Sequence, residues 1–184
     1  MYEHSKKSQD LAVRLQRFMD EHIYPNEEAY AHQLKAAENR FAPLPLMDEL
    51  KLEAKEAGLW NLFVPEEHAE YCDHGGLSFF DYAPLAEIMG RVIWCPEVFN
   101  CNAPDTGNME VFMNYATEAQ QREWLDPLLA GDIRSSYAMT EPQVASSDAT
   151  NVELRIEKAG NEWVLNGHKW FITNAMYERT KILI

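Results

Sequence analysis

Apolar side chains in the first two-thirds of the chain recur at helical spacing. The first stripe consists of Leu11, Leu15, Phe18, Met19 and His22. A second stripe follows a break at Pro43 and Pro45, is closed by Gly58, and consists of Leu46, Leu50, Ala54 and Ala57. Residues 117–120 form a capping box ahead of a further apolar run, which Gly131 ends. These patterns predict a helical domain.

Proline and small polar residues mark the expected ends of these helices. Pro25 ends the first helix, and Asn26 is a candidate cap for the next one. Ser78 can cap a later helix, whose inward side chains would be Tyr82, Leu85, Ala86 and Met89. Residues 59–65 are apolar but short, so we expect them to form a buried, irregular connection.

The periodicity changes from helical to twofold after Asp132. Residues 133–139 can form a strand. Apolar and charged residues then alternate over residues 152–157, as they do in a half-buried strand. Residues 159–161 are expected to turn the chain into a further strand at 163–165.

Asn166-Gly167 is the next turn signal, typical of a two-residue hairpin that leads into residues 169–173. Strands joined by such short turns form antiparallel sheets. The predicted fold class is therefore α+β. An all-helical domain over residues 1–132 precedes the first part of an antiparallel β domain over residues 133–184.

The length and composition allow one domain and part of a second. The chain has 184 residues, of which 46% are hydrophobic and 11% aromatic, which is enough for a hydrophobic core. No apolar run approaches the roughly 18 residues of a membrane span, so we expect no membrane insertion. The N-terminus lacks the features of a secretory signal or transit peptide, which predicts a cytoplasmic protein.

Acidic residues dominate the middle of the chain. The net charge is −14, and residues 61–133 carry 2 basic and 13 acidic side chains. Such a surface repels phosphate groups, so nucleic-acid binding is not expected. A solvated helical surface explains the charge more simply than an acidic docking site, although both readings fit.

Cysteine and histidine give no metal-binding pattern. Cys72, Cys95 and Cys101 are odd in number and lack Cys-x-x-Cys spacing, which favours reduced thiols. The six histidines are scattered along the chain. We therefore predict no metal site.

Hydroxyl and aromatic residues are concentrated in two segments of the β region. The isoalloxazine ring of a flavin needs hydrogen-bond donors along its polar edge and apolar contacts on its faces. Thr140 and Thr173 lie at the ends of two predicted strands, with Met139 and Phe171 as apolar neighbours. The two threonines are therefore candidate donors to a flavin.

Ser146 and Ser147 lie in a turn whose backbone N–H groups suit a pyrophosphate. Each candidate also has an ordinary structural explanation when taken alone: a strand-end cap, a surface turn or core packing. Their joint occurrence, in order and after a helical domain, favours the flavin site.

Together the two segments resemble the flavin-binding signature of the acyl-CoA dehydrogenase family, with its Thr-Glu-Pro…Ser-Asp and aromatic-Ile-Thr-Asn elements. These elements stand at residues 140–148 and 171–174. The resemblance extends to residues 64–67, 75–76, 83–91, 104–110 and 121–131. It is strongest for the subgroup that is fused to a kinase-like domain in some members and is linked to long-chain and hydroxylated acyl-CoAs.

The resemblance implies FAD as the cofactor and assigns roles to five side chains. Tyr137, Met139 and Thr140 would line the flavin, with the Thr140 hydroxyl toward N1 and C2=O. Phe171 would lie against the ring where many relatives have tryptophan. Thr173 would donate toward N5.

The same resemblance places Ser147 between the flavin pyrophosphate and the acyl-CoA, with Ser146 as a second cofactor contact. The loop from Thr140 to Asp148 is one residue longer than the common family form and lacks its glycines. Trp170 is an alternative to Phe171 as the stacking residue. Glu141 is expected to be structural.

The function that the resemblance implies is FAD-dependent dehydrogenation of an acyl-CoA to a trans-2-enoyl-CoA. No catalytic residue is assigned in this chain, because the family's base lies on a C-terminal helical domain expected downstream of Ile184. Electrons would pass to an electron-transferring flavoprotein, and a homodimer or homotetramer is expected.

Two other functions fit the sequence. An acyl-CoA oxidase would keep the fold and use oxygen as the electron acceptor. A non-catalytic helical interaction domain derived from the enzyme would bind no flavin, although an unfinished β edge is unfavourable for a stable monomer.

Overall fold

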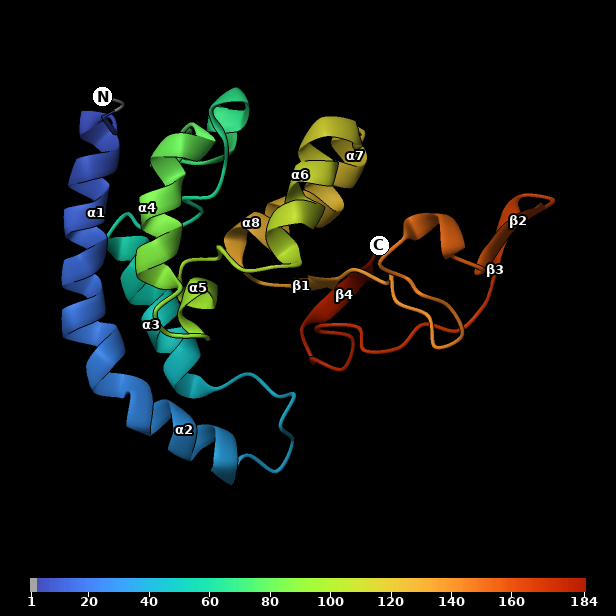
Figure 1. The fold of residues 1–184 in the computed structure, drawn as a ribbon, viewed down its shortest axis with the longest axis horizontal. Helices are drawn as coiled ribbons and strands as arrows, with labels where there is room; N and C mark the ends of the chain where they lie inside the picture. Colours follow the sequence, from blue (N-terminus) through green and yellow to red (C-terminus); the bar gives the residue numbers. More distant parts are fainter. Residues whose placement is uncertain (1–2) are drawn as a thin grey trace.

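The computed structural model of the protein describes residues 3–184. Figure 1 shows a body of helices that is joined through one strand to a thinner, strand-containing end. The helices are α1 (Lys6–Phe18), α2 (Glu27–Ala36), α3 (Pro45–Glu56), α4 (Phe79–Met89), α5 (Cys95–Val98), α6 (Asp105–Tyr115), α7 (Glu118–Gln120) and α8 (Asp126–Ala130). The strands are β1 (Arg134–Ser136), β2 (Arg155–Ala159), β3 (Glu162–Asn166) and β4 (Thr180–Leu183). Among the described residues, no helix is both long and apolar enough to cross a membrane.

α1 buries the apolar stripe that its sequence predicts. The Ser5 hydroxyl caps the helix by accepting a hydrogen bond from the Ser8 N–H at 3.2 Å. Leu11, Leu15 and Phe18 are buried. The helix then widens into a π-helical turn at Met19–Ile23, and both end residues of that turn are fully buried.

Pro25 does not separate α1 from α2 as the sequence suggests. It lies in a 3₁₀ turn, Tyr24–Asn26, that leads directly into α2. Asn26 occupies the N-cap position of α2, as predicted, but its side chain caps no N–H of α2. Its amide donates instead to the His22 carbonyl at 2.8 Å. The chain is already helical before Asn26, so its amide closes the preceding turn.

The main core lies between α1, α3, α4 and α5, with α1 running alongside α4 (Figure 1). Ser78 caps α4 as predicted and accepts from the Asp81 N–H at 3.2 Å. Leu85, Ile88 and Met89 form the buried face of α4. Ala86 is exposed, contrary to expectation, because it lies about 100° around the helix from Leu85.

A second core cluster joins α6 and α8 to the connection after α3. Residues 59–65 form the irregular buried connection that the sequence predicts. The cluster consists of Phe63, Val64, Met109, Met113, Leu125 and Leu128. The capping box predicted at residues 117–120 is present, and Gly131 ends α8 with a left-handed φ of 76°.

Two buried asparagines fasten this second cluster to the main core. Asn61 and Asn100 have left-handed φ values of 57° and 55°, which asparagine tolerates better than most residues. The Asn100 amide donates to Asn61 Oδ1 at 2.7 Å and to the Leu128 carbonyl at 2.9 Å. Asn61 in turn donates to the Leu129 carbonyl at 3.0 Å. The last carbonyls of α8 are thereby satisfied from the opposite core.

β2 and β3 form an antiparallel hairpin in which Ala159 pairs with Glu162. This confirms the turn predicted at residues 159–161, where Gly160 has a φ of 65°. The second hairpin, predicted at Asn166-Gly167, is wrong. The chain continues irregularly after β3, and a Cβ on Gly167 would lie 2.8 Å from the side chain of Leu154, so a close approach explains this glycine.

β1 pairs with β4 in parallel, with Ser135 opposite Ile182 and Ser136 opposite Leu183. The antiparallel arrangement thus applies to the β2–β3 pair, and a parallel pair lies against the helices. A parallel pair needs a long connection between its strands. Residues 137–179 form that connection, and it contains every predicted cofactor contact.

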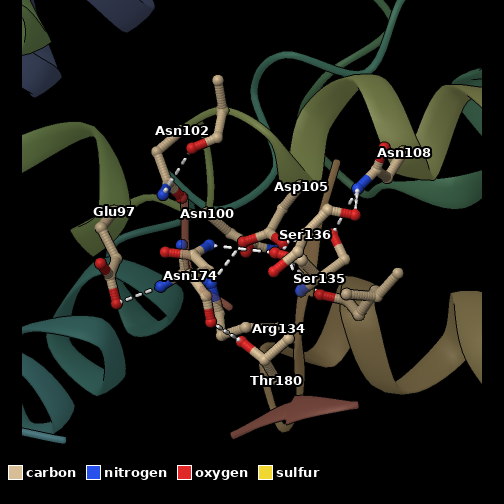
Figure 2. A network of polar contacts seen from close by, with 12 residues as sticks. Glu97, Asn100, Asn102, Asp105, Asn108, Arg134, Ser135, Ser136, Asn174 and Thr180 are labelled. Atoms are coloured by element: carbon tan, nitrogen blue, oxygen red, sulfur yellow. Dashed lines mark hydrogen bonds and ion pairs between the residues drawn. The ribbon is translucent and has the colours of Figure 1, made fainter. Parts of the chain in front are cut away.

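β1 begins in a buried network of charged and polar groups (Figure 2). Arg134 is 2% exposed, and its guanidinium forms ion pairs with Asp105 of α6 and Glu97 of α5. Asp105 also accepts from the Ser135 N–H at 2.7 Å and the Ser135 hydroxyl at 2.5 Å. Lys51 of α3 completes the network, 2.7 Å from Glu97.

The network is balanced in charge, with two cations and two carboxylates. Burial raises the pKa of the Glu97 carboxyl, but Arg134 and Lys51 outweigh burial and hold that pKa below its usual range. Each buried charge therefore depends on its partners remaining in place.

Replacing Arg134 with Met should lower the free energy of unfolding by about 3–5 kcal/mol, because Asp105 would stay buried without its cation. Urea unfolding of the variant measures this loss. Arg122→Met is the matched control, since the Arg122 side chain is 70% exposed in its pair with Glu118, and it should change stability by less than about 0.5 kcal/mol. Equal stabilities for the two variants would contradict the role assigned to Arg134.

Candidate functional site

The predicted cofactor residues lie on two segments that the fold brings into contact. The first follows β1 and contains Tyr137, Met139 and Thr140. The second follows the β2–β3 hairpin. The Lys169 ammonium donates to the Met139 carbonyl at 2.9 Å, and the Trp170 N–H donates to the Thr140 carbonyl at 3.0 Å. Residues about 30 positions apart in sequence therefore form one surface.

Glu141 organises the loop of the first segment. Its side chain is buried, and its carboxylate accepts from the Lys169 ammonium at 2.8 Å and from the N–H groups of Glu153 and Leu154 at 2.8 and 2.9 Å. These three donors, the Lys169 bond foremost, lower the pKa of Glu141 to about 2. Glu141 is ionised at neutral pH and its carboxylate is held by three hydrogen bonds, which supports the structural role expected for it.

The two serines of this loop differ in accessibility. Ser146 is 5% exposed, and its hydroxyl accepts from the Glu141 N–H at 2.8 Å. Ser147 is exposed. The next residue, Asp148, accepts from the N–H and hydroxyl of Thr150 at 3.0 and 2.7 Å, which lowers the pKa of Asp148. The hydroxyl of Ser146 is thus used inside the loop, whereas that of Ser147 faces outward from it.

Two adjacent aromatic rings project from the second segment. Phe171 is 83% exposed and has a φ of 52°, a left-handed value that is uncommon for a bulky residue. Trp170 is 42% exposed, and the two ring centroids are 4.6 Å apart. Both rings line a hollow of about 510 Å³, together with Thr173 and with Phe41 from the helical part. Backbone strain that presents an aromatic ring to solvent is typical of a binding surface.

Asn174 anchors the far end of the second segment. It has a φ of 66°, and its side-chain amide donates to the Ser135 carbonyl at 3.1 Å. Its own carbonyl accepts from the Thr180 hydroxyl at 2.7 Å (Figure 2). Thr173 therefore lies between the Lys169 contacts on one side and the Asn174 contacts on the other.

The structure pairs neither Thr140 nor Thr173 through its hydroxyl with another of the described residues. Both hydroxyls remain available to a ligand. Sequence reasoning identified these two threonines but missed the residues that hold them, Lys169 and Asn174. Asn174 is part of the aromatic-Ile-Thr-Asn element, so its presence in the motif was the available signal.

A second hollow, of about 390 Å³, lies beside Tyr137. Its walls lie near the start of α6 and are mostly small or apolar, with Asn108 as a polar member: Ala103, Pro104, Thr106, Gly107, Asn108 and Val111. A Cβ added at Gly107 would meet nothing within 4 Å, so this glycine faces open space. Tyr137 connects this hollow to the segment that carries Thr140.

The described residues hold no group of three or more His, Cys, Asp and Glu side chains placed to bind a metal ion. Cys72, Cys95 and Cys101 are free thiols. Burial raises the pKa of Cys95 and of Cys101 to about 12, so neither is a reactive thiolate at neutral pH.

Comparison with known proteins identifies the family. The profile of the acyl-CoA dehydrogenase N-terminal domain matches residues 5–132, and that of the middle domain matches residues 136–184. Acyl-CoA dehydrogenase family member 11 of Gallus gallus is 45% identical over the whole chain. The chain therefore belongs to the acyl-CoA dehydrogenase family.

Solved structures share this fold. A candidate acyl-CoA dehydrogenase from Mycobacterium abscessus matches all of the chain with a TM-score of 0.89 and 44% identity. A glutaryl-CoA dehydrogenase from Mycobacterium smegmatis, solved in complex with FADH2, matches 94% of the chain with a TM-score of 0.62 and 21% identity. The chain spans 23% of the length of the Gallus gallus protein, 46% of the M. abscessus chain and 40% of the M. smegmatis chain.

Replacing Glu141 with Gln should loosen the loop at neutral pH, because a neutral amide is a weaker acceptor for Lys169 and the two N–H groups. Hydrogen exchange at the Glu153 and Leu154 amides should become faster by about tenfold or more. Glu162→Gln, at an exposed position of β3, is the control and should leave this exchange unchanged.

The pH dependence follows from the lowered pKa of Glu141. A depressed pKa contributes stability that is fully present above the usual value of 4.5 and is lost as the pH falls toward about 2. The Glu153 and Leu154 amides should therefore exchange more slowly in the wild type than in Glu141→Gln at pH 5, and this difference should disappear near pH 2. Loss of this difference already at pH 5 would show that the carboxylate does not hold the loop.

Proposed function

We propose that this chain carries the flavin-edge and acyl-CoA-contact parts of an enzyme that uses FAD to dehydrogenate an acyl-CoA to a trans-2-enoyl-CoA. The observation that carries the proposal is the convergence of the two signature segments through Lys169 and Trp170. That convergence leaves two threonine hydroxyls and an exposed aromatic ring on one surface. Membership of the family supports the same function.

The chemistry of this surface fits a flavin. Thr140 and Thr173 would donate hydrogen bonds to its polar edge, while Met139, Phe171 and Tyr137 would supply apolar contacts. Ser147, whose side chain is exposed, would contact the pyrophosphate and the acyl-CoA. We keep Ser146 as a cofactor contact only through its backbone, because its hydroxyl bonds inside the loop. Bound FAD would accept the hydride that leaves the β-carbon of the substrate.

The residues of this chain would bind and orient the substrate, and we assign none of them as the catalytic base. A base must accept a proton, which requires an accessible carboxylate with a pKa near the working pH. Glu141 directly follows the predicted contact Thr140, and its pKa of about 2 and three hydrogen bonds exclude it. The base is proposed to lie in another part of the protein.

The hollow beside Tyr137 is where we place the acyl chain. It is continuous with the cofactor segment through Tyr137, and its walls are mostly small or apolar. Exposed apolar walls of this kind favour a hydrocarbon over a charged group. The open space at Gly107 leaves room for a long chain.

Two further points of the proposal concern partners. Reduced flavin would pass its electrons to an electron-transferring flavoprotein, and the working form would be a homodimer or homotetramer in the cytoplasm.

Release of hydrogen peroxide without an added acceptor would instead favour an acyl-CoA oxidase. A folded, full-length protein that binds no FAD would favour the non-catalytic interaction domain.

Replacing Thr173 with Val in the protein with its full natural sequence tests the cofactor assignment. Loss of the donated hydrogen bond should weaken FAD binding or slow flavin reduction by acyl-CoA by about tenfold or more. Thr173→Ser keeps the hydroxyl and should behave like the wild type. FAD titration and stopped-flow flavin absorbance measure the two effects, and wild-type values for the Val variant would remove Thr173 from the site.

Replacing Gly107 with Leu tests the acyl-chain assignment. The added side chain would fill the hollow without a clash, so kcat/KM should fall about tenfold for long acyl-CoAs and change little for short ones. Gly107→Ala should have a smaller effect in the same direction. Because alanine and leucine favour a helix over glycine, neither variant should lower the melting temperature. An equal loss for all chain lengths would place the acyl chain elsewhere.

A further inference from the structure

A cluster of contacts links the helical part to the segment after Thr173. Arg179 forms a bidentate ion pair with Asp48 in the first turn of α3, with Nη1–Oδ1 and Nη2–Oδ2 distances of 2.6 Å each. Beside it, the Asn39 amide donates to the Glu178 carboxylate at 2.8 Å, and the Glu178 N–H donates to the Phe41 carbonyl at 3.2 Å. Two neighbouring residues of the segment are thus fixed to the helical part.

The stretch between Thr173 and Arg179 is short and internally bonded. The Tyr177 N–H donates to the Asn174 carbonyl at 2.9 Å, and the Thr180 N–H donates to the Tyr177 carbonyl at 3.0 Å. The Thr180 hydroxyl returns to the Asn174 carbonyl. Residues 174–180 therefore form one internally bonded block, and an anchor at Arg179 restrains Thr173 at the other end of the block.

Phe41, which belongs to the helical part, lines the same hollow of about 510 Å³ as Phe171 and Thr173. The Glu178–Phe41 backbone hydrogen bond and the neighbouring Asp48–Arg179 ion pair join these two walls.

We propose that Asp48 and Arg179 are a positioning pair, which holds Phe171 and Thr173 at the separation from Tyr137–Thr140 that a bound flavin requires. This inference rests on the proposed function. The pair touches neither cofactor nor substrate and acts through the block at residues 174–180. A bidentate arginine–carboxylate contact gives the directional restraint that such a role needs.

The pair is well suited to separate positioning from folding. The two side chains are 33% and 39% exposed, so their loss creates no buried charge. Arg179→Met should therefore leave the melting temperature of the flavin-free protein close to that of the control, Arg122→Met. Arg122 offers the same substitution in an exposed ion pair far along the chain, on the turn before α8.

The test is a titration of FAD into flavin-free protein of full natural sequence, followed by flavin fluorescence at low and high salt. We expect Arg179→Met to raise the Kd for FAD about threefold to tenfold at low salt and Arg122→Met to leave it within about twofold. High salt should bring the wild type toward the Arg179→Met value, because salt screens exposed ion pairs. The visible circular dichroism of bound FAD should change in Arg179→Met alone.

The charge-reversed double variant, Asp48→Arg with Arg179→Asp, tests whether the ion pair itself, and not the Arg179 charge alone, carries the effect on FAD affinity. The double variant should reverse at least half of the increase in log Kd for FAD that Arg179→Met causes. An unchanged Kd in Arg179→Met would overturn the positioning role while leaving the proposed function intact, and so would a weaker affinity that the double variant does not recover. Failure of the wild type to bind FAD would overturn the proposed function, and the positioning role with it.

Discussion

The ion network around Arg134 is the interaction on which the rest of the structure depends. Arg134, Asp105 and Lys51 are buried and Glu97 is half-buried. A buried charge that loses its partner is strongly unfavourable, so the network tolerates one arrangement of its members. Because Asp105 accepts from both the Arg134 side chain and the Ser135 backbone, β1 cannot slide along α6 by even one residue. The register of β1 fixes where Tyr137 leaves the sheet. The same register also fixes the second signature segment, because the Asn174 side chain donates to the Ser135 carbonyl of β1.

Within the candidate site, the groups that hold the loop differ in burial from those proposed to bind a ligand. Glu141 is buried and accepts three hydrogen bonds, and Lys169 is half-buried and donates two. Thr173 and Phe171 are exposed and present a hydroxyl and an aromatic face. The loop of this chain lacks the glycines of the common family form, and the Glu141 carboxylate, which accepts three donors, holds its shape.

Features set by neighbouring residues were predictable from the sequence. The helical stripes, the caps at Ser78 and Thr117 and the turn at residues 159–161 depend on side chains a few positions apart. The helical-to-strand succession and the family followed from such patterns and from the signature motifs. Prediction failed where a distant contact decided the outcome. Asn166-Gly167 forms no hairpin, and Gly167 lies close to Leu154 instead. The Lys169–Glu141 and Arg179–Asp48 pairs join residues that are 28 and 131 positions apart in the sequence.

The β2–β3 hairpin stands apart from this scheme, since all ten of its paired residues are exposed. Trp163, Val164 and Leu165 are 63%, 50% and 62% exposed, and successive strand residues point to opposite faces, so both faces of the hairpin carry apolar surface. An isolated two-stranded hairpin is marginally stable in water. The signature segments on either side of it are nevertheless held by Glu141, Lys169 and Asn174. The candidate cofactor surface is therefore held by contacts between its own segments and, through Asn174, by β1.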